Sequence, residues 1–265
     1  MSELLLLEKN GAVATITFNR PDKANALDVS WLGAITRYLG EVAQDANIRC
    51  VLIRGNGKHF MAGGDLEMLQ DMAAHPPDKR ATLAQDSIRA CNDMIRAMRN
   101  FAKPIVASVQ GGVAGSAVGL VAACDLVVAA DSAFFVLAHV ALGASNDGMT
   151  TYFLPRQVGT RKALELALLG DRVMAPQAKE LGMVNFVVPA ADLAVETDKL
   201  VQRLCAGPTR AYGLIKTLID ASLDNTLDQQ GELESKLYCE AARTADLVEG
   251  INAVLGKRAA KFGGH

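Results

Sequence analysis

The sequence lacks the marks of a disulfide framework, a metal centre and a nucleic-acid-binding surface. Its five cysteines stand singly, without a CxxC pair or metal-ligand spacing, which favours reduced, mostly buried thiols. The 27 Lys and Arg residues nearly balance the 29 Asp and Glu residues, and neither sign forms long blocks. This balance gives no electrostatic reason to expect DNA, RNA or an anionic membrane as a partner.

Long apolar runs and targeting signals are also lacking. No segment reaches the roughly 18 apolar residues of a membrane span. The short apolar run at residues 4–7 has neither a basic flank nor a cleavage site, so it does not read as a signal peptide. We therefore expect a soluble, cytoplasmic protein.

What is present is a chain of 265 residues, half of them apolar, which can bury one sizeable core. Strand-like and helix-like segments alternate over most of the chain, which predicts an α/β core. From Asp192 onward nearly everything reads as helical, with a break at Gly207-Pro208. We divide the chain into an α/β core over residues 1–195 and a helical domain over residues 196–265.

Local signals place several elements. Asn10-Gly11, between two alternating segments, predicts a β-hairpin with a type I′ turn. Asp28 stands where a helix N-cap should. Residues 73–80 carry two prolines and several charges and are expected to form an exposed loop before a long helix that starts at Thr82.

Two turns of the sequence are rich in glycine and alanine. Phe60–Asp65 and the start of the stretch from Val109 to Asp125 each lie between a strand and a helix. Free N–H groups at a helix start carry the positive end of the helix dipole, so two such turns could bind one oxyanion. Tight packing is the other explanation of these small residues. The glycines at 111, 112, 115 and 119 do not have the spacing of a dinucleotide-binding loop.

Together these turns resemble a known family. NRPDKANALD (19–28), HFMAGGDLEML (59–69), KPIVASVQGGVAGSAVG (103–119) and LGASNDGMTTYFLPRQVG (142–159) are similar to segments of the crotonase (enoyl-CoA hydratase/isomerase) superfamily. AKELG (178–182) and EGINAVLGKRAAKF (249–262) extend the resemblance over essentially the whole chain. It implies an α/β fold built as a spiral of ββα units with a C-terminal helical trimerisation domain, acting on acyl-CoA thioesters.

The resemblance assigns roles by position. It implies that the N–H groups of Gly64 and Ser116 form an oxyanion hole for the thioester carbonyl. It also implies that coenzyme A lies against a further set of positions: Lys23, Ala24, Ala62, Asp65, Leu66 and, near the C-terminus, Lys257 and Phe262. The last two often close the site of a neighbouring subunit, in a homotrimer or a dimer of trimers. Asn19-Arg20 could contact CoA or form a strand-ending salt bridge. No metal or redox cofactor is implied, because CoA arrives as part of the substrate.

The chain departs from the hydratases of this family, which use two glutamates. Their positions hold Gly119 and His139 here. Asp147 instead matches the catalytic aspartate of several isomerases, the naphthoate synthases and the aryl-CoA dehalogenase, and the ring-epoxide isomerase branch is the most similar group. One carboxylate above an enolate can perform a 1,3-allylic shift, so we favour an isomerase with Asp147 as base. Asp147 could also cap the helix expected to begin near Thr150.

His139, at the end of the expected strand Phe134–Leu137, has three possible roles. It could be a packed core residue, a second acid/base beside Asp147 in a hydratase, or the partner of Ser116 in a thioesterase or peptidase. Loss of both glutamates also permits a non-catalytic CoA-ligand-binding protein. Dehalogenation is disfavoured, because Asn92 occupies the position of that enzyme's base.

Overall fold

Two sheets form the α/β core. The computed structural model describes residues 4–265. The larger sheet has the strand order β1-β2-β3-β4-β6-β9, and the smaller one has the order β5-β7-β8. All neighbouring strands are parallel except β1–β2 and β7–β8. The strands are β1 (Leu5–Asn10), β2 (Val13–Phe18), β3 (Cys50–Gly55), β4 (Ile105–Val109), β5 (Gly112–Ala114), β6 (Leu126–Ala130), β7 (Phe134–Val136), β8 (Val173–Met174) and β9 (Phe186–Val188).

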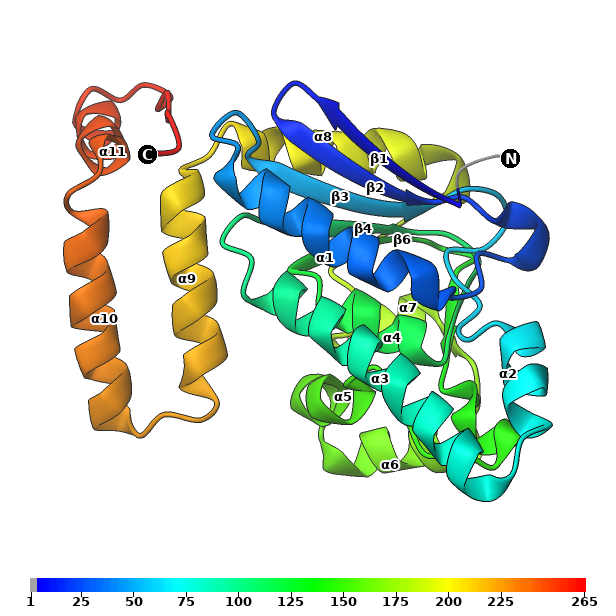
Figure 1. The fold of residues 1–265 in the computed structure, drawn as a ribbon. Helices are drawn as coiled ribbons and strands as arrows, with labels where there is room; N and C mark the ends of the chain where they lie inside the picture. Colours follow the sequence, from blue (N-terminus) through cyan, green and yellow to red (C-terminus); the bar gives the residue numbers. More distant parts are fainter. Residues whose placement is uncertain (1–3) are drawn as a thin grey trace.

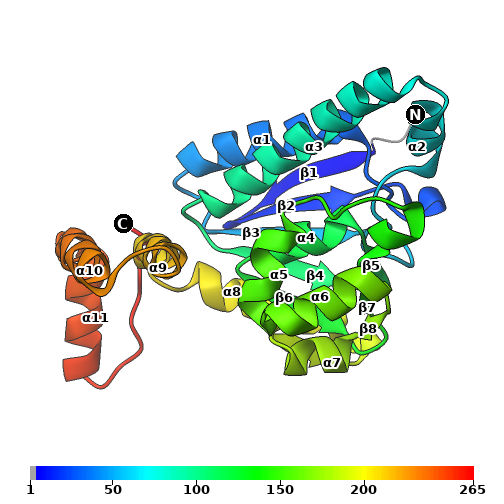
Figure 2. The same ribbon diagram turned by 90° about the horizontal axis from the view of Figure 1, so that it is seen from below.

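Helices cover both faces of the larger sheet (Figures 1 and 2). The helices are α1 (Val29–Gln44), α2 (Leu66–Ala73), α3 (Pro77–Arg99), α4 (Ser116–Ala122), α5 (Thr150–Val158), α6 (Thr160–Leu169), α7 (Ala175–Glu180), α8 (Leu193–Cys205), α9 (Thr209–Ser222), α10 (Leu227–Ala241) and α11 (Ala245–Leu255). Helices α1 and α3 lie on one face and α8 on the other. None of the helices among residues 4–265 is long and apolar enough to cross a membrane.

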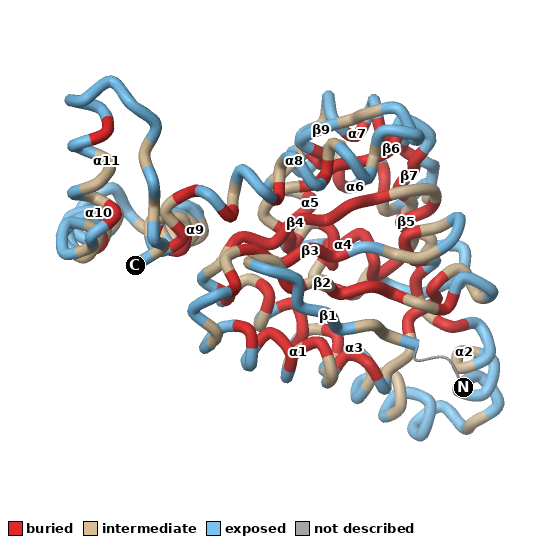
Figure 3. Tube along the Cα trace, turned by 90° about the horizontal axis from the view of Figure 1, so that it is seen from above, coloured by how far each residue is buried: buried red, intermediate tan, exposed pale blue. Residues whose placement is uncertain are grey.

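Strand β3 shows how the sequence supports this layering. Val51 and Ile53 belong to the main apolar core beneath α1 and α3, whereas Cys50 and Leu52 belong to a second cluster beneath α8. Successive side chains of a strand point to opposite faces, so a strand buried on both sides must be apolar throughout. Figure 3 shows the resulting band of buried chain through the centre of the core.

The structure corrects two local predictions. In the hairpin, Asn10 pairs with Val13, so the turn residues are Gly11 and Ala12, and Gly11 alone of these has a positive φ, 55°. Helix α3 begins at Pro77, so most of the segment expected as a loop over residues 73–80 is helical. The N–H groups in the first turn of a helix have no partner within the helix, so the missing N–H of proline costs nothing there. Pro77 can therefore begin this helix. The Asp28 N-cap is confirmed, because its carboxylate accepts the N–H of Ser30 at 2.8 Å.

The C-terminal helices α9, α10 and α11 form a lobe beside the core, and ion pairs join α9 to it (Figures 1 and 2). The predicted division after residue 195 falls inside α8, which packs on the sheet through Val201 and Cys205. Arg49, just before β3, ties the linker to the core by donating to the carbonyl of Gly207 and the hydroxyl of Thr209. Large apolar side chains remain exposed on the three helices: Ile215, Ile219, Tyr238, Val254 and Leu255.

Candidate active site

The two glycine-rich turns lie side by side although about fifty residues separate them. Met61 and Val113 form an isolated parallel bridge, with Met61 N–H donating to the Gly112 carbonyl and Ala114 N–H donating to the Met61 carbonyl. A Cβ atom added at Gly63 would lie 2.8 Å from the carbonyl oxygen of Ala114. Gly63 also has a φ of +86°, so this close approach requires glycine.

Each turn presents a backbone donor next to this contact. Within residues 4–265 the N–H groups of Gly64 and Ser116 have no hydrogen-bond acceptor, whereas the neighbouring residues are paired into the bridge. Ser116 is the first residue of α4, where an N–H has no intrahelical partner, and it is 7% exposed. Backbone donors away from water are nearly always paired. Ser116 is buried and Gly64 half-buried, so two unpaired donors in adjacent turns are suited to an anionic oxygen.

A third turn, residues 146–149, packs against the start of α4. A Cβ at Gly148 would lie 2.9 Å from the Cα of Ser116, and a Cβ at Gly119 would lie 1.7 Å from the carbonyl oxygen of Gly148. The space that a side chain at position 119 would need is therefore filled by the Gly148 backbone. This contact excludes a glutamate at position 119 in the present conformation and places Asp147, the residue before Gly148, next to the turn that begins α4.

The carboxylate of Asp147 in this turn is hydrogen-bonded to His139. Its Oδ1 lies 2.8 Å from Nε2 of His139, and the side-chain amide nitrogen of Asn146 lies 3.1 Å from Nδ1 of His139. The His139 side chain is 9% exposed and the Asp147 side chain 32% exposed. Burial, and then the negative charge of Asp147, raise the pKa of the Cys91 thiol on α3 to about 12.

These contacts decide between several readings of the sequence. Helix α5 has no side-chain cap, so the prediction that the Asp147 carboxylate caps it is wrong; the Asp147 carbonyl accepts from Thr150 instead. His139 lies in a short 3-10 turn, Ala138–Leu142, after β7 rather than at the strand end. Both of its ring nitrogens are engaged by Asn146 and Asp147, and no hydrogen bond joins it to Ser116 in the described chain.

The residues expected along the CoA channel form one cross-linked edge. The Ala62 N–H donates to the Ala24 carbonyl, and Lys23 forms an ion pair with Glu67. Leu66 is 70% exposed at the start of α2. The edge therefore joins the loop before α1 to the loop before α2.

Asp65 has a structural role in this edge. Its carboxylate accepts from Arg20 at 2.8 Å and caps α2 through the Glu67 N–H. Burial raises the pKa of Asp65, but the hydrogen bond from Arg20, that from Glu67 N–H and the nearby positive charges outweigh it and lower the pKa. Of the two readings of Arg20, the salt bridge is confirmed.

Lys257 and Phe262 are not brought to the two turns within this chain. They follow α11, at the end of the molecule opposite α2 (Figure 1). The Phe262 carbonyl accepts from Arg49, and its ring lies against Gly250. Any contact of these two residues with an oxyanion-bound substrate would have to come from another copy of the chain.

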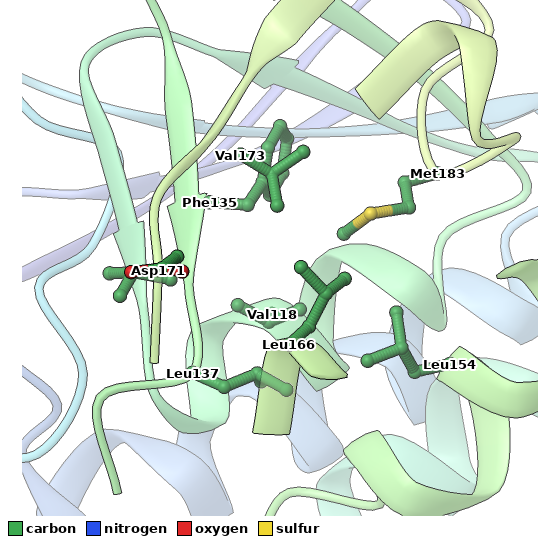
Figure 4. Close-up of a pocket in the computed structure, with 9 residues that line it drawn as sticks. Val118, Phe135, Leu137, Leu154, Leu166, Asp171, Val173 and Met183 are labelled. Atoms are coloured by element: carbon green, nitrogen blue, oxygen red, sulfur yellow. The ribbon is translucent and has the colours of Figure 1, made fainter. Parts of the chain in front are cut away.

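Two cavities lie among the elements around this site. Behind α4 the core is nearly filled, leaving about 10 Å³ bordered by the side chains in Figure 4, among them Val118, Phe135 and Leu154. A far larger cavity of about 930 Å³ lies between α3, α5 and α9 and is bordered by Met149 and Tyr152.

The sequence reasoning passed over two asparagines. Asn25 is fully buried, has a φ of 53°, and joins three loop segments through its side chain, accepting from Arg20 N–H and donating to the carbonyls of Asn56 and His59. Asn146 holds the His139 ring. The usable signal was the residue type, because asparagine tolerates left-handed backbone and bonds locally in turns.

Comparison with known proteins gives the class of this site. The enoyl-CoA hydratase/isomerase family model matches residues 8–265. The chain is 37% identical to the 1,2-epoxyphenylacetyl-CoA isomerase of Escherichia coli K12, with 100% of both chains covered. It is 32% identical to a trans-2-decenoyl-(acyl-carrier-protein) isomerase of Streptococcus mutans, covering 99% of this chain and 98% of the other.

Solved structures of enoyl-CoA hydratases have the same fold as this chain. A crystal structure of an enoyl-CoA hydratase from Polaromonas sp. JS666 superposes with a TM-score of 0.91 at 33% identity, covering 97% of this chain and 99% of that one. The chain belongs to the enoyl-CoA hydratase/isomerase family, whose crotonase fold the sequence motifs predicted.

Proposed function

We propose that this protein is an acyl-CoA isomerase that moves a double bond, with Asp147 as its single base. The thioester oxygen would accept the N–H groups of Gly64 and Ser116, which stabilise the negative charge of the enolate. Asp147 would remove a proton next to the thioester carbonyl and return it two carbons further along. One preorganised oxyanion donor contributes roughly 3–4 kcal/mol to lowering such a barrier.

The observation that carries this proposal is the contact between Gly119 and Gly148. It leaves no room for a side chain where the family resemblance puts the first hydratase glutamate, and Asp147, the residue before Gly148, lies next to the turn of Ser116. A hydratase needs one group to activate water and a second to protonate carbon. Here the second candidate, His139, has both nitrogens engaged. The names of two relatives, both isomerases, agree with this choice, whereas three other relatives are named hydratases.

The substrate in this proposal is a thioester of coenzyme A with an unsaturated or ring-containing acyl group. CoA enters as part of the substrate, and the chemistry requires neither a metal nor a redox cofactor. The edge formed by Lys23, Ala24, Ala62 and Leu66 would carry the CoA moiety. Lys257 and Phe262 would complete the site of a neighbour in a homotrimer or dimer of trimers, for which the exposed apolar side chains of α9 to α11 offer a surface.

The test uses a 3-enoyl-CoA and crotonyl-CoA as separate substrates and follows absorbance of the conjugated enoyl thioester. We expect the 3-enoyl substrate to gain conjugation and crotonyl-CoA to stay unchanged. Asp147→Asn should lower the isomerisation rate about 10²- to 10⁴-fold, the usual contribution of a general base. Asp131→Asn, an exposed carboxylate in a turn of the same core, is the control and should retain full activity. Rapid hydration of crotonyl-CoA that survives Asp147→Asn would refute the proposal in favour of a hydratase.

A further inference from the structure

We propose that His139 and Asn146 are positioning residues that fix how Asp147 presents its carboxylate to the substrate. In this arrangement a neutral imidazole, held in one tautomer, donates to one carboxylate oxygen and leaves the other to carry the proton. The inference rests on the proposed function, because it assigns the orientation of the proposed base.

The two hydrogen bonds of His139 show which group donates and which accepts in each. An amide NH₂ can only donate, so the Asn146 side chain, 3.1 Å away, makes Nδ1 of His139 an acceptor without a proton. The neutral ring then carries its single proton on Nε2, which lies 2.8 Å from Oδ1 of Asp147. An ionised carboxylate only accepts hydrogen bonds. Asn146 therefore donates to His139, and His139 donates to Asp147.

Packing holds the ring and leaves the carboxylate accessible. His139 is 9% exposed at its side chain, and a Cβ added at Gly115 would lie 3.7 Å from its Nε2 and 3.8 Å from its Cε1. The imidazole therefore lies directly against the second oxyanion turn. The Asp147 side chain is 32% exposed, so the carboxylate that must reach the substrate is more accessible than the histidine that holds it.

This geometry separates the two oxygens of Asp147. Oδ1 is occupied by His139, whereas Oδ2 accepts no hydrogen bond from any residue between 4 and 265. In the isomerisation, a C–H bond next to the thioester breaks, an O–H bond forms on Oδ2, and the electron pair moves into the enolate. That O–H bond then breaks as a C–H bond forms two carbons away, and the carboxylate is restored. A carboxylate fixed in one plane can deliver the proton to the second carbon before exchanging it with water.

The tautomer can be tested without any activity. The chain has four histidines, so ¹⁵N-histidine labelling gives a simple spectrum in which His139→Gln identifies the signals of His139. We expect the ¹⁵N chemical shift of an unprotonated ring nitrogen at Nδ1 and that of a protonated one at Nε2. Asn146→Leu should bring the two shifts closer together, because the second tautomer becomes populated. Protonation of both nitrogens at neutral pH would overturn the inference, because His139 would then be a charged second acid.

Kinetics in D₂O test the consequence for Asp147. His139→Leu removes the donor, whereas His139→Gln keeps an N–H at a similar reach. We expect His139→Leu to lower kcat about 10- to 100-fold with KM within about threefold, the usual effect of misplacing a reacting group by about 1 Å. It should also raise the fraction of solvent deuterium in the product. His139→Gln should recover most of both. Circular dichroism would check that both variants are folded.

The outcomes separate the two proposals. An inactive wild-type enzyme with the expected NMR signature would reject the isomerase function and leave the hydrogen-bond arrangement standing. An active wild type whose folded His139→Leu variant keeps its kcat and proton retention would reject the positioning role alone.

Discussion

The contact between Gly119 and the Gly148 carbonyl can be perturbed by a single methyl group. In Gly119→Ala the new Cβ would start 1.7 Å from the carbonyl oxygen, and Cβ atoms practically never approach another heavy atom within 3.0 Å. The turn must therefore retreat by at least about 1.3 Å, the difference between these distances. Overpacking of this kind costs about 1–3 kcal/mol of stability.

The displacement should affect rate more than stability, because Asp147 precedes Gly148. A misplacement of about 1 Å at a reacting group lowers the rate about 10²-fold, so we expect Gly119→Ala to lose that much kcat while remaining folded. The assay is isomerisation of a 3-enoyl-CoA, paired with urea unfolding of the same preparation.

Gly40→Ala is the matched control. It lies inside α1, and its added Cβ would have nothing within 4 Å. We expect it to gain about 0.5–1 kcal/mol from the helix preference for alanine and to keep full activity. If Gly119→Ala retains its kcat within about twofold, the reasoning that Gly148 sets the position of Asp147 is refuted.

Three further predictions concern stability, its pH dependence and thiol accessibility. Arg20→Leu leaves the Asp65 carboxylate buried without its partner and should cost about 3 kcal/mol in urea unfolding; Arg37→Leu, on the exposed face of α1, should change it by less than about 0.5 kcal/mol. Because the pKa of Asp65 is lower in the folded state, its contribution is present above about pH 4 and is lost as pH falls through the folded value. Asp65→Asn should therefore flatten the fall of unfolding free energy with acid, and an unchanged slope would contradict this. Of the five cysteines Cys239 is exposed and the others are buried, so a thiol reagent should modify one group quickly in the native protein and all five in denaturant; a second fast thiol would contradict the burial.

Local signals in the sequence sufficed where short-range chemistry decides structure. The Asp28 cap, the start of α2 after Asp65 and the two glycine turns follow from residue types within a few positions of each other. The family motifs supplied the order of the units and hence the fold. The roles of Gly64 and Ser116 as donors stay predictions.

Contacts between distant segments were beyond the sequence. The glycine at 119 was visible, but not that the Gly148 carbonyl fills its space. Asp147 suggested either a base or a cap, and the structure decides against the cap because α5 has no side-chain cap and the carboxylate bonds to His139 instead. Asn146 was not singled out because its partner, a ring nitrogen seven positions earlier, depends on how the intervening chain folds back.

The bridge between Met61 and Val113 has a consequence for how the site responds to heat. Phe60, Met61 and Val113 are fully buried, so opening the turns that carry the two N–H groups would expose core side chains. The turn that carries Asp147 is different, because residues 141–145 before it are exposed. Segments with few buried contacts open at lower free energy than core strands. On warming, we therefore expect the turns of Gly64 and Ser116 to stay in place, and the segment that leads into Asp147 to fluctuate first.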